Sequence, residues 1–375
     1  MTTKLLNILT GINRPSGPSS GSMILVHDLY RAMPELHTTF LGRAPVDQPW
    51  AASFDRLIPL STPKRPQGPN FDRYLDELTC EVGCLIQRIK PDAIHAQYVG
   101  FALSLAFARA AGAIPIISIA HGPDVMAAER SPREHNTLME VAAASAAIVA
   151  PTSALADRID RLTGHRFTDR LTILPWGIPL RDARVRDQLP TGTGALSLVH
   201  AGRLDENKST ITAIEALALT NQPHRLTVIG HGPLREHLEQ RVTERRLRER
   251  VRLEPFLPRQ ELWRRLPDFD AFIFTTSGLE AFGLVLIEAQ AHGLPIVYSD
   301  LPGVRHTVGD AGVPYAPGDP RSLAEALDEM GQDRRRRTAL AKQAFHNARQ
   351  YEISATGRQL RELTLHVTWD RPPRQ

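Results

Sequence analysis

The sequence has 375 residues and a mass of 41.6 kDa, a length that favours two domains over one. Its 42% hydrophobic and 23% charged residues are typical of a globular protein and exclude wholesale disorder. The pI of about 9.3 accompanies a formal net charge of only +4, with 19 Lys and Arg against 17 Asp and Glu up to residue 185. Because neither half is strongly basic, the composition argues against nucleic-acid binding as the main role.

The cysteines and the N-terminus indicate a cytoplasmic chain. The first 17 residues have too short an apolar run for a secretory signal, and nowhere do the ~18 to 20 consecutive apolar residues of a membrane span occur. Two cysteines, Cys80 and Cys84, are too few for a disulfide framework. With no nearby His or third Cys they also fall short of a metal site, so we expect them to pack within a helix.

In the first half, short aliphatic runs alternate with amphipathic stretches. The stretch 71–90 shows the helical signal, because Phe71, Leu75 and Leu78 begin an apolar stripe with spacings of three and four. The predicted strands are 4–9, 37–41, 92–96, 115–120, 147–150 and 171–174, and the predicted helices are 22–33, 71–90, 101–111, 134–145 and 153–162.

A polar stretch with two Gly and one Pro follows at 187–195 and reads as a linker. The alternation then restarts and ends in a helical, Arg-rich stretch at 338–367. The predicted strands are 196–201, 225–230, 251–255, 271–275, 295–298 and 313–315, and the predicted helices are 210–219, 234–249, 283–292 and 322–330.

This order predicts an α/β protein of two Rossmann-like, parallel-sheet domains, because buried strands without polar alternation are typical of sheets covered by helices on both faces. The predicted domains are 1–185 and 196–355, with a linker at 186–195 and a C-terminal helix and tail at 356–375 that pack back towards the first domain. Ligands of open parallel sheets bind beyond the carboxyl ends of the strands, so we expect the chemistry in a cleft between the domains.

The segment 275–297 is the most informative. A strand ends, a loop carries Glu280, and a helix that begins near Gly283 carries Glu288 about two turns further on. Free N–H groups of Phe282, Gly283 and Leu284 at the helix start make an anion site. Two flanking carboxylates suit a ligand with hydroxyls on both sides of a phosphate. The alternative is a capped amphipathic helix with a solvated glutamate.

A second segment, 201–209, follows the first strand of the second half. Gly202 permits close backbone approach, and Arg203 and Lys208 lie on the loop, where one could offer a fork and the other a point charge to a phosphate. Gly230 and Gly232 after the next strand again leave room for a ligand against the backbone. Basic loop residues of this kind are also commonly just solvated.

Taken together, these motifs are more specific than any one of them. The sequence resembles the large retaining glycosyltransferase family, with the GT-B fold and of the family four type, that includes glycogen synthases, sucrose synthases and mannosyltransferases. The resemblance covers most of the chain. It is carried by EAFGLVLIE (280–288), AHGLPIV (291–297), GRLDENK (202–208) and GHGPL (230–234), and by the stretches 17–22, 90–95, 119–122, 151–153, 174–178 and 302–323.

The resemblance implies a nucleotide-diphosphate sugar, held mostly by the second domain. Arg203 and Lys208 then hold the diphosphate, aided by the helix dipole, and Glu288 takes the ribose hydroxyls. Glu280 orients the donor sugar and His121 contacts it from the first domain. The full donor-binding set is Arg203, Lys208, Gly232, Ser277, Phe282, Gly283, Leu284 and Glu288, the catalytic set is Glu280 and His121, and the phosphate or acceptor side has Gly21, Ser22, Arg130 and Arg133.

In this family the reaction retains the anomeric configuration, and the leaving phosphate accepts the acceptor's proton. The resemblance therefore implies that no protein nucleophile is required. We expect no metal and no cofactor beyond the nucleotide-sugar co-substrate, with UDP the favoured nucleotide. The pair Asp268 and Asp270 matches a metal-gripping pattern of other glycosyltransferases but reads better as a turn and strand entry. Pro302 and His306 depart from the family pattern, as does Ser22.

The acceptor is open. The predicted helix 71–90 mixes acids and bases, so we favour a small soluble acceptor over a lipid, and membrane association is not expected. The arginine runs 241–252 and 334–337 lie among acids and indicate a solvated face, not a nucleic-acid site. A cell-wall, lipid or polysaccharide glycosyltransferase, an epimerase, a phosphorylase and an inactive sugar-nucleotide-binding protein remain alternatives. A monomer and a homodimer are both open.

Overall fold

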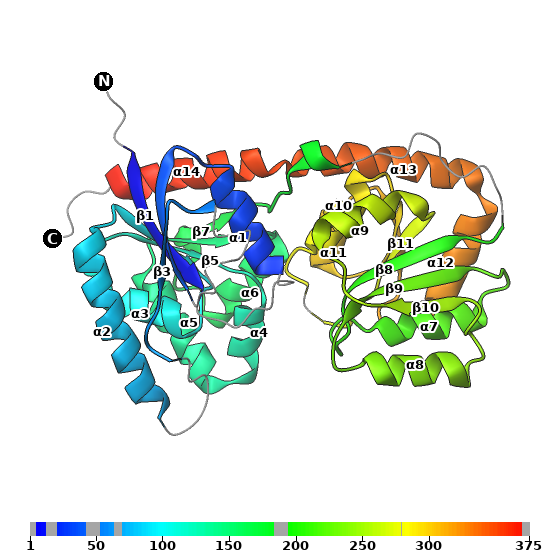
Figure 1. Ribbon diagram of the computed structural model, residues 1–375, viewed down its shortest axis with the longest axis horizontal. Helices are drawn as coiled ribbons and strands as arrows, with labels where there is room; N and C mark the ends of the chain where they lie inside the picture. Colours follow the sequence, from blue (N-terminus) through cyan, green and yellow to red (C-terminus); the bar gives the residue numbers. More distant parts are fainter. Residues whose placement is uncertain are drawn as a thin grey trace. The chain divides into compact units, whose positions relative to one another are not determined.

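The computed structural model describes residues 5–12, 21–42, 53–63, 70–183, 194–278 and 280–369. The chain forms two compact units: Met1–Gly177 together with Ile353–Gln375, and Ile178–Glu352 (Figure 1). The first unit thus ends ahead of the boundary at residue 185 that the sequence suggested. Of the expected linker 186–195, residues 186–193 lie outside the described residues, and Gly194 donates a backbone hydrogen bond to Gly331 within the second unit.

The first unit contains a seven-stranded sheet in the order β3-β2-β1-β4-β5-β6-β7, and every pair of neighbouring strands described is parallel. Its strands are β1 (Leu6–Ile12), β2 (Leu36–Gly42), β3 (Arg56–Pro59), β4 (Ala93–Gln97), β5 (Ile116–Ile119), β6 (Ala147–Ala150) and β7 (Leu171–Ile173). Its helices are α1 (Gly21–Arg31), α2 (Phe71–Ile89), α3 (Ala102–Ala110), α4 (Pro123–Arg130), α5 (Pro132–Ala144), α6 (Ser153–Leu162) and α14 (Ile353–Trp369).

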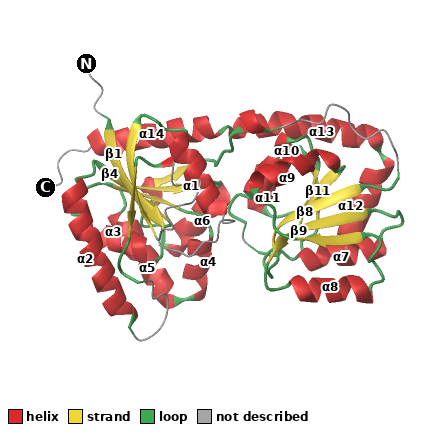
Figure 2. Ribbon diagram, viewed as in Figure 1, coloured by secondary structure: helices red, strands yellow, loops and turns green. Residues whose placement is uncertain are grey.

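Helices cover both faces of this sheet. Because successive side chains of a strand point to opposite faces, Ile94 of β4 packs in the core with α2 and α3, whereas His95 turns the other way. There His95 bonds to Tyr30 of α1 and Thr364 of α14. Figure 2 shows α1 and α14 together on that side of the strands, with α2, α3 and α5 on the other. The C-terminal helix therefore completes the first unit.

The second unit contains a six-stranded parallel sheet in the order β10-β9-β8-β11-β12-β13. Its strands are β8 (Ser197–Arg203), β9 (Arg225–His231), β10 (Val251–Glu254), β11 (Ala271–Phe274), β12 (Ile296–Ser299) and β13 (Gly312–Tyr315). Its helices are α7 (Thr210–Leu219), α8 (Arg235–Glu244), α9 (Arg259–Arg265), α10 (Leu284–Ala291), α11 (Pro302–Val308), α12 (Pro320–Gln332) and α13 (Arg334–Ala348). The α/β class with two Rossmann-like, parallel-sheet domains, predicted from the sequence, is confirmed.

Several elements differ from the prediction. The helix expected at 338–367 is two helices, because a 3-10 turn at Arg349–Tyr351 separates α13 from α14. Strand β3 and helices α4, α9 and α11 were not predicted. Helix α11 begins at Pro302, where a proline fits the first helical turn. The expectation that Cys80 and Cys84 pack was wrong, since both are exposed on α2 with free thiols.

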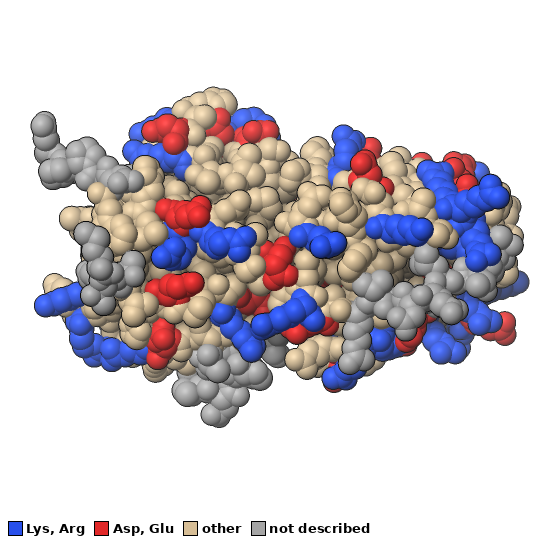
Figure 3. Space-filling model, turned by 90° about the horizontal axis from the view of Figure 1, so that it is seen from above, with Lys and Arg blue, Asp and Glu red and all other residues tan. Residues whose placement is uncertain are grey.

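Many charged side chains of the described residues form ion pairs. Within the run 241–252, Arg241 pairs with Glu215 and Glu244, and Arg245 pairs with Glu215. On the face shown in Figure 3, Lys and Arg lie among Asp and Glu on each unit. In the part of the chain that the structure describes, no helix has the length and apolar character to cross a bilayer.

Close backbone approach at the carboxyl ends of β8 and β9 requires glycine. Gly202 and Gly230 face each other in register, and a Cβ on Gly230 would overlap the carbonyl oxygen of Gly202. A Cβ on Gly232 would likewise overlap the carbonyl oxygen of Leu204. These glycines hold the loop after β8 against the strand beside it.

We therefore expect Gly230→Ala to lower the unfolding free energy by about 1–3 kcal/mol, because backbone atoms must move to admit the methyl group. The control is Gly83→Ala in α2, where the nearest atom to a new Cβ is the Cβ of Ala110 at 3.9 Å. A glycine in a helix interior costs about 0.5–1 kcal/mol relative to alanine, so this variant should unfold at the same or higher urea concentration. Equal unfolding midpoints for the two variants would contradict the close approach.

Candidate functional site

The strand order of the second sheet reverses between β8 and β11, since β9 and β10 continue from one side and β12 and β13 from the other. Such a switch point, at the carboxyl ends of the strands, is where open parallel sheets bind ligands. Arg203 is the last residue of β8, and Thr275 follows β11. Lys208 and Ser277, both predicted to hold the donor, thus lie on the loops at this point.

The loop after β8 is ordered by its own side chains. Asp205 accepts a hydrogen bond from the backbone N–H of Lys208 (3.1 Å) and forms an ion pair with Arg203 Nη2 (3.1 Å). Ser209 then adopts a left-handed conformation (φ 44°) from which α7 starts. Arg203 keeps 69% of its side chain exposed and can reach a ligand, while Lys208 is turned inward.

Among the described residues, four hydrogen bonds join this loop to the one after β11. The carbonyl of Asn207 accepts from Ser277 N (3.0 Å) and Thr276 Oγ1 (2.9 Å), and the carbonyl of Lys208 accepts from Thr275 Oγ1 (2.6 Å). The hydroxyl of Ser277 also donates to the carbonyl of Glu206 (3.2 Å). Ser277, predicted to bind the donor, therefore has a structural part, because its backbone and its side chain both join the two loops. The position of Lys208 is fixed on both sides.

Lys208 forms an ion pair with Glu280, so the structure brings together two residues that the sequence placed 72 positions apart. Only 17% and 14% of the two side chains are exposed. The ammonium nitrogen also lies 5.1 Å from the centroid of the Phe274 ring. Gly303 of α11 runs against the backbone of Glu280, where a Cβ would lie 2.5 Å from its carbonyl oxygen.

Helix α10 begins beside this pair. Gly283 precedes it with a left-handed φ of 75°, and no side chain caps the helix. Among the described residues, none accepts a hydrogen bond from the N–H groups of Phe282, Gly283 or Leu284. The side chain of Phe282 is buried edge-on against Tyr351, with ring centroids 5.4 Å apart. The free N–H groups and the helix dipole can therefore receive an anion.

Glu288, two turns into α10, is paired with a residue that the sequence analysis missed. Arg259 Nε lies 3.0 Å from Glu288 Oε1, with 16% and 9% of the side chains exposed. The guanidinium carbon of Arg259 is 4.5 Å from the centroid of the Trp263 ring. Arg259 directly follows the loop at the carboxyl end of β10, and its place just beyond a predicted strand was the available signal.

The pairing predicts strong coupling between Arg259 and Glu288. In a double-mutant cycle of Arg259→Gln and Glu288→Gln, each single change leaves one largely buried charge without its partner. The double variant should therefore lose less unfolding free energy than the sum of the losses in the two single variants. We expect a coupling of about 0.5–3 kcal/mol in unfolding free energy. The exposed pair Arg73 and Glu77, at 3.0 Å on α2, should give about 0.3–0.5 kcal/mol in the same measurement. Equal coupling in both cycles would contradict this assignment.

His121 lies in the first unit, in the turn after β5. Its Nε2 is 3.0 Å from Gln97 Oε1, and its ring packs on Tyr98 (4.7 Å between centroids) and Trp176 (5.9 Å). Burial lowers the pKa of His121 to about 3, so the imidazole is neutral at pH 7. Tyr98 has a φ of 90°, and residues with such strained backbone conformations are frequent at functional sites. The sequence analysis did not single out Gln97 or Tyr98, although a glutamine directly after the predicted strand 92–96 was a signal.

The residues predicted for the acceptor side are more scattered. Gly21 and Ser22 are the first residues of α1. Arg130 is exposed at the end of α4, and Arg133 lies over the ring of Phe71 at 4.6 Å. Among the described residues, no hydrogen bond, ion pair or ring contact connects either arginine to His121. All four acceptor-side roles stay predictions.

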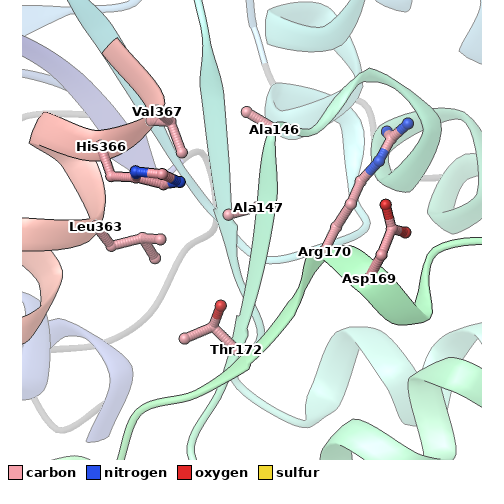
Figure 4. Close-up of a pocket in the computed structure, with 8 residues that line it drawn as sticks. All are labelled: Ala146, Ala147, Asp169, Arg170, Thr172, Leu363, His366 and Val367. Atoms are coloured by element: carbon pink, nitrogen blue, oxygen red, sulfur yellow. The ribbon is translucent and has the colours of Figure 1, made fainter. Parts of the chain in front are cut away.

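A pocket of about 420 Å³ opens in the first unit between β6, β7 and α14 (Figure 4). Arg170 on its wall already donates to the carbonyl oxygens of Ala143 (3.0 Å) and Ser145 (2.9 Å). None of the residues predicted for the site line it. Asp270, weighed above as a metal ligand, instead accepts a hydrogen bond from Ser197 N (2.8 Å) at the entry of β11.

Two family models match this chain and together cover most of it. Residues 20–182 match "Glycosyltransferase Family 4" and residues 182–347 match "Glycosyl transferases group 1". The chain belongs to the GT-B glycosyltransferases of the family 4 type. The resemblance noted from its motifs is thereby confirmed.

Curated relatives of this glycosyltransferase are 27% and 31% identical to it over the aligned stretches. A glycogen synthase of Mycobacterium tuberculosis is 27% identical over 71% of this chain and 67% of its own length. A D-inositol 3-phosphate glycosyltransferase of Xylanimonas cellulosilytica is 31% identical over 63% of this chain, and the match spans only 60% of that protein.

Solved structures share its fold. A sucrose-phosphate synthase from Thermosynechococcus elongatus superposes with a TM-score of 0.83 at 20% identity, covering 98% of this chain and 100% of that one. HepE from Anabaena, in complex with UDP and glucose, superposes with a TM-score of 0.77 at 18% identity, covering 96% and 99%. At these identities the likeness concerns the fold of the glycosyltransferase.

Proposed function

We propose that this glycosyltransferase moves a hexose-type sugar, with retention of configuration, from a nucleotide-diphosphate sugar to a hydroxyl group of a small soluble acceptor. The observation that carries the proposal is the grouping of Lys208, Glu280 and the open N-terminus of α10 on loops at one switch point. UDP is the nucleotide we favour, and the likeness to HepE, whose structure contains UDP and glucose, supports that choice.

In this proposal the diphosphate competes with Glu280 for Lys208. An incoming phosphate takes hydrogen bonds from the Lys208 ammonium and from the free N–H groups before α10, and the exposed Arg203 closes on it from the loop after β8. The Glu280 carboxylate, relieved of part of its pairing, then accepts hydrogen bonds from the sugar hydroxyls. Glu288, held by Arg259, takes the ribose hydroxyls.

The same groups favour the transition state. As the bond between the anomeric carbon and the phosphate oxygen breaks, negative charge grows on the leaving diphosphate, and the cations and helix dipole stabilise it more than they stabilise the bound donor. The acceptor oxygen forms its bond to the anomeric carbon on the same face, and its proton passes to the leaving phosphate. The diphosphate's charge is met by Lys208, Arg203 and the helix, so we propose no metal ion and no further cofactor.

For the acceptor we propose a small cytoplasmic molecule. On α2, the helix whose charge we weighed against membrane docking, Arg73 is paired with Glu77, and Glu81 accepts hydrogen bonds from Ser61 and Thr62. A helix that docks on an anionic membrane presents a face of cations, whereas α2 carries acids beside its cations. An acceptor screen tests this choice, and transfer to a lipid or a polysaccharide would contradict it.

The first test is nucleotide binding. In a thermal-shift panel of UDP, GDP, ADP and TDP, the cognate nucleotide should raise the melting temperature of the protein most. A ligand that binds the folded state stabilises that state by mass action. Lys208→Met removes a charge-assisted hydrogen bond worth about 1.5–3 kcal/mol, so binding should weaken by about 10- to 100-fold. Lys342→Met, an exposed lysine of α13, is the matched control and should bind as the wild type does.

Turnover separates the alternatives. A transferase releases free nucleoside diphosphate only when an acceptor is present, an epimerase releases none, and an inactive binding protein shows binding without release. We expect Glu280→Ala and Lys208→Ala each to abolish most of the acceptor-dependent release. Unchanged release in either variant would show that the roles given to these residues are wrong.

A further inference from the structure

A chain of buried hydrogen bonds runs through the first unit and ends at His121. It consists of Thr10 (β1), Tyr30 (α1), His95 and Gln97 (β4), and Thr364 (α14), each of them at most 3% exposed. On this side of the sheet, these polar side chains occupy buried positions that are usually filled by aliphatic residues. Because these side chains are buried and bond to one another, the direction of each bond follows from its partners.

The first end of the chain is fixed at Thr10. Its hydroxyl lies 2.8 Å from the carbonyl oxygen of His95, which can only accept, so the hydroxyl proton points there. Thr10 Oγ1 must then accept from the group beside it, which is Gln97 at 3.0 Å. The atom of Gln97 that faces Thr10 is therefore the amide nitrogen, and the amide oxygen faces His121.

The second end is fixed independently at Thr364. Its hydroxyl donates to the carbonyl of Leu360 (2.7 Å), so it accepts from His95 Nε2 (3.0 Å). Burial lowers the pKa of His95 to about 3, and a neutral ring that carries its proton on Nε2 accepts on Nδ1. Tyr30 OH donates to that nitrogen (2.9 Å) and in turn accepts from Gln97 Nε2 (3.2 Å). Both ends thus orient the Gln97 amide in the same way.

The consequence reaches His121. Gln97 Oε1 can only accept, so His121 Nε2 carries the ring proton and Nδ1 has a free lone pair. The described residues offer Nδ1 no hydrogen-bond partner, and Nδ1 is not among their fully buried unpaired atoms. The nitrogen left for a ligand is therefore an acceptor.

We propose that Gln97 is a positioning residue that fixes His121 in the tautomer protonated on Nε2, so that Nδ1 accepts a hydrogen bond from a hydroxyl of the donor sugar. The tautomer follows from the first unit alone, whereas the sugar contact rests on the proposed function. The substrate class follows from the chemistry. A sugar with a hydroxyl at this position can donate to Nδ1, a deoxy sugar cannot, and a uronic acid presents a carboxylate whose lone pairs repel that of Nδ1.

The tautomer is read by nuclear magnetic resonance of protein labelled with 15N-histidine, in which protonated and unprotonated ring nitrogens have well-separated chemical shifts. His121→Asn identifies the signals of His121. We expect the wild type to show a protonated Nε2 and an unprotonated Nδ1. Gln97→Met, of similar size, removes the acceptor and should give a mixture of tautomers. A protonated Nδ1 in the wild type, or an unchanged pattern in Gln97→Met, overturns the proposal.

Variants that keep Gln97 make the test independent of any folding defect in Gln97→Met. Thr10→Val and Tyr30→Phe each remove one of the two constraints on the amide, so each single variant should keep the wild-type tautomer. The double variant frees the amide to turn over and should give a mixture. A wild-type pattern in the double variant would overturn the assignment as well.

Ligands then test the sugar contact. UDP-glucose should move the Nδ1 signal and UDP alone should not. In Gln97→Met, kcat should fall about tenfold, by the worth of one hydrogen bond, with the affinity for UDP unchanged. An Nδ1 signal that ignores UDP-glucose, although UDP binds, overturns the sugar contact. If no nucleotide binds at all, it is the proposed function that fails, and the tautomer is still read.

Discussion

Both sheets of this protein are covered by helices on both faces, and that constraint determines where its polar groups can lie. A polar side chain that is buried within a strand is costly unless protein groups make its hydrogen bonds. His200 of β8 shows the rule, because its two ring nitrogens lie 3.1 Å from the carbonyl of Ile273 and 3.1 Å from the hydroxyl of Thr210. Groups that are to meet a ligand are left to the loops at the carboxyl ends of the strands, where the chain order reverses.

At that edge of the second sheet the charges are paired with each other. An isolated Lys208 or Glu280, less than a fifth exposed, would carry a large desolvation cost, and their ion pair offsets it. Under the proposed function, the pair also explains how a site for an anion can contain carboxylates. A diphosphate that takes over Lys208 replaces one anionic partner by another, so the cation is not left unpaired at any stage. Arg259 does the same for Glu288, and the geometry of both carboxylates is set before a ligand arrives.

The sequence predicted the parallel sheets well, because each buried strand is a short aliphatic run, as at 147–150 and 271–275. It also brought out Lys208, Glu280 and Glu288, whose motifs lie close to predicted strand ends. What it missed depends on tertiary contacts. The break between α13 and α14 is invisible in the helical periodicity, since it is held by the backbone of Ile178 donating to Tyr351. Arg259 and Gln97 are ordinary residues until their partners, far away in the sequence, are known.

Helix α14 illustrates how far such dependence can extend. Its Thr364 lies 269 residues after His95 in the sequence, yet the Thr364 hydroxyl orients His95 and, through Tyr30, helps to orient Gln97. Thr364 can do so only because the helix itself supplies a carbonyl, that of Leu360, to take the hydroxyl proton. The end of the chain therefore contributes more than apolar cover to the first unit. A backbone carbonyl at each end of a buried network makes every proton in it determinate, and a histidine at its edge then has one defined face for a ligand.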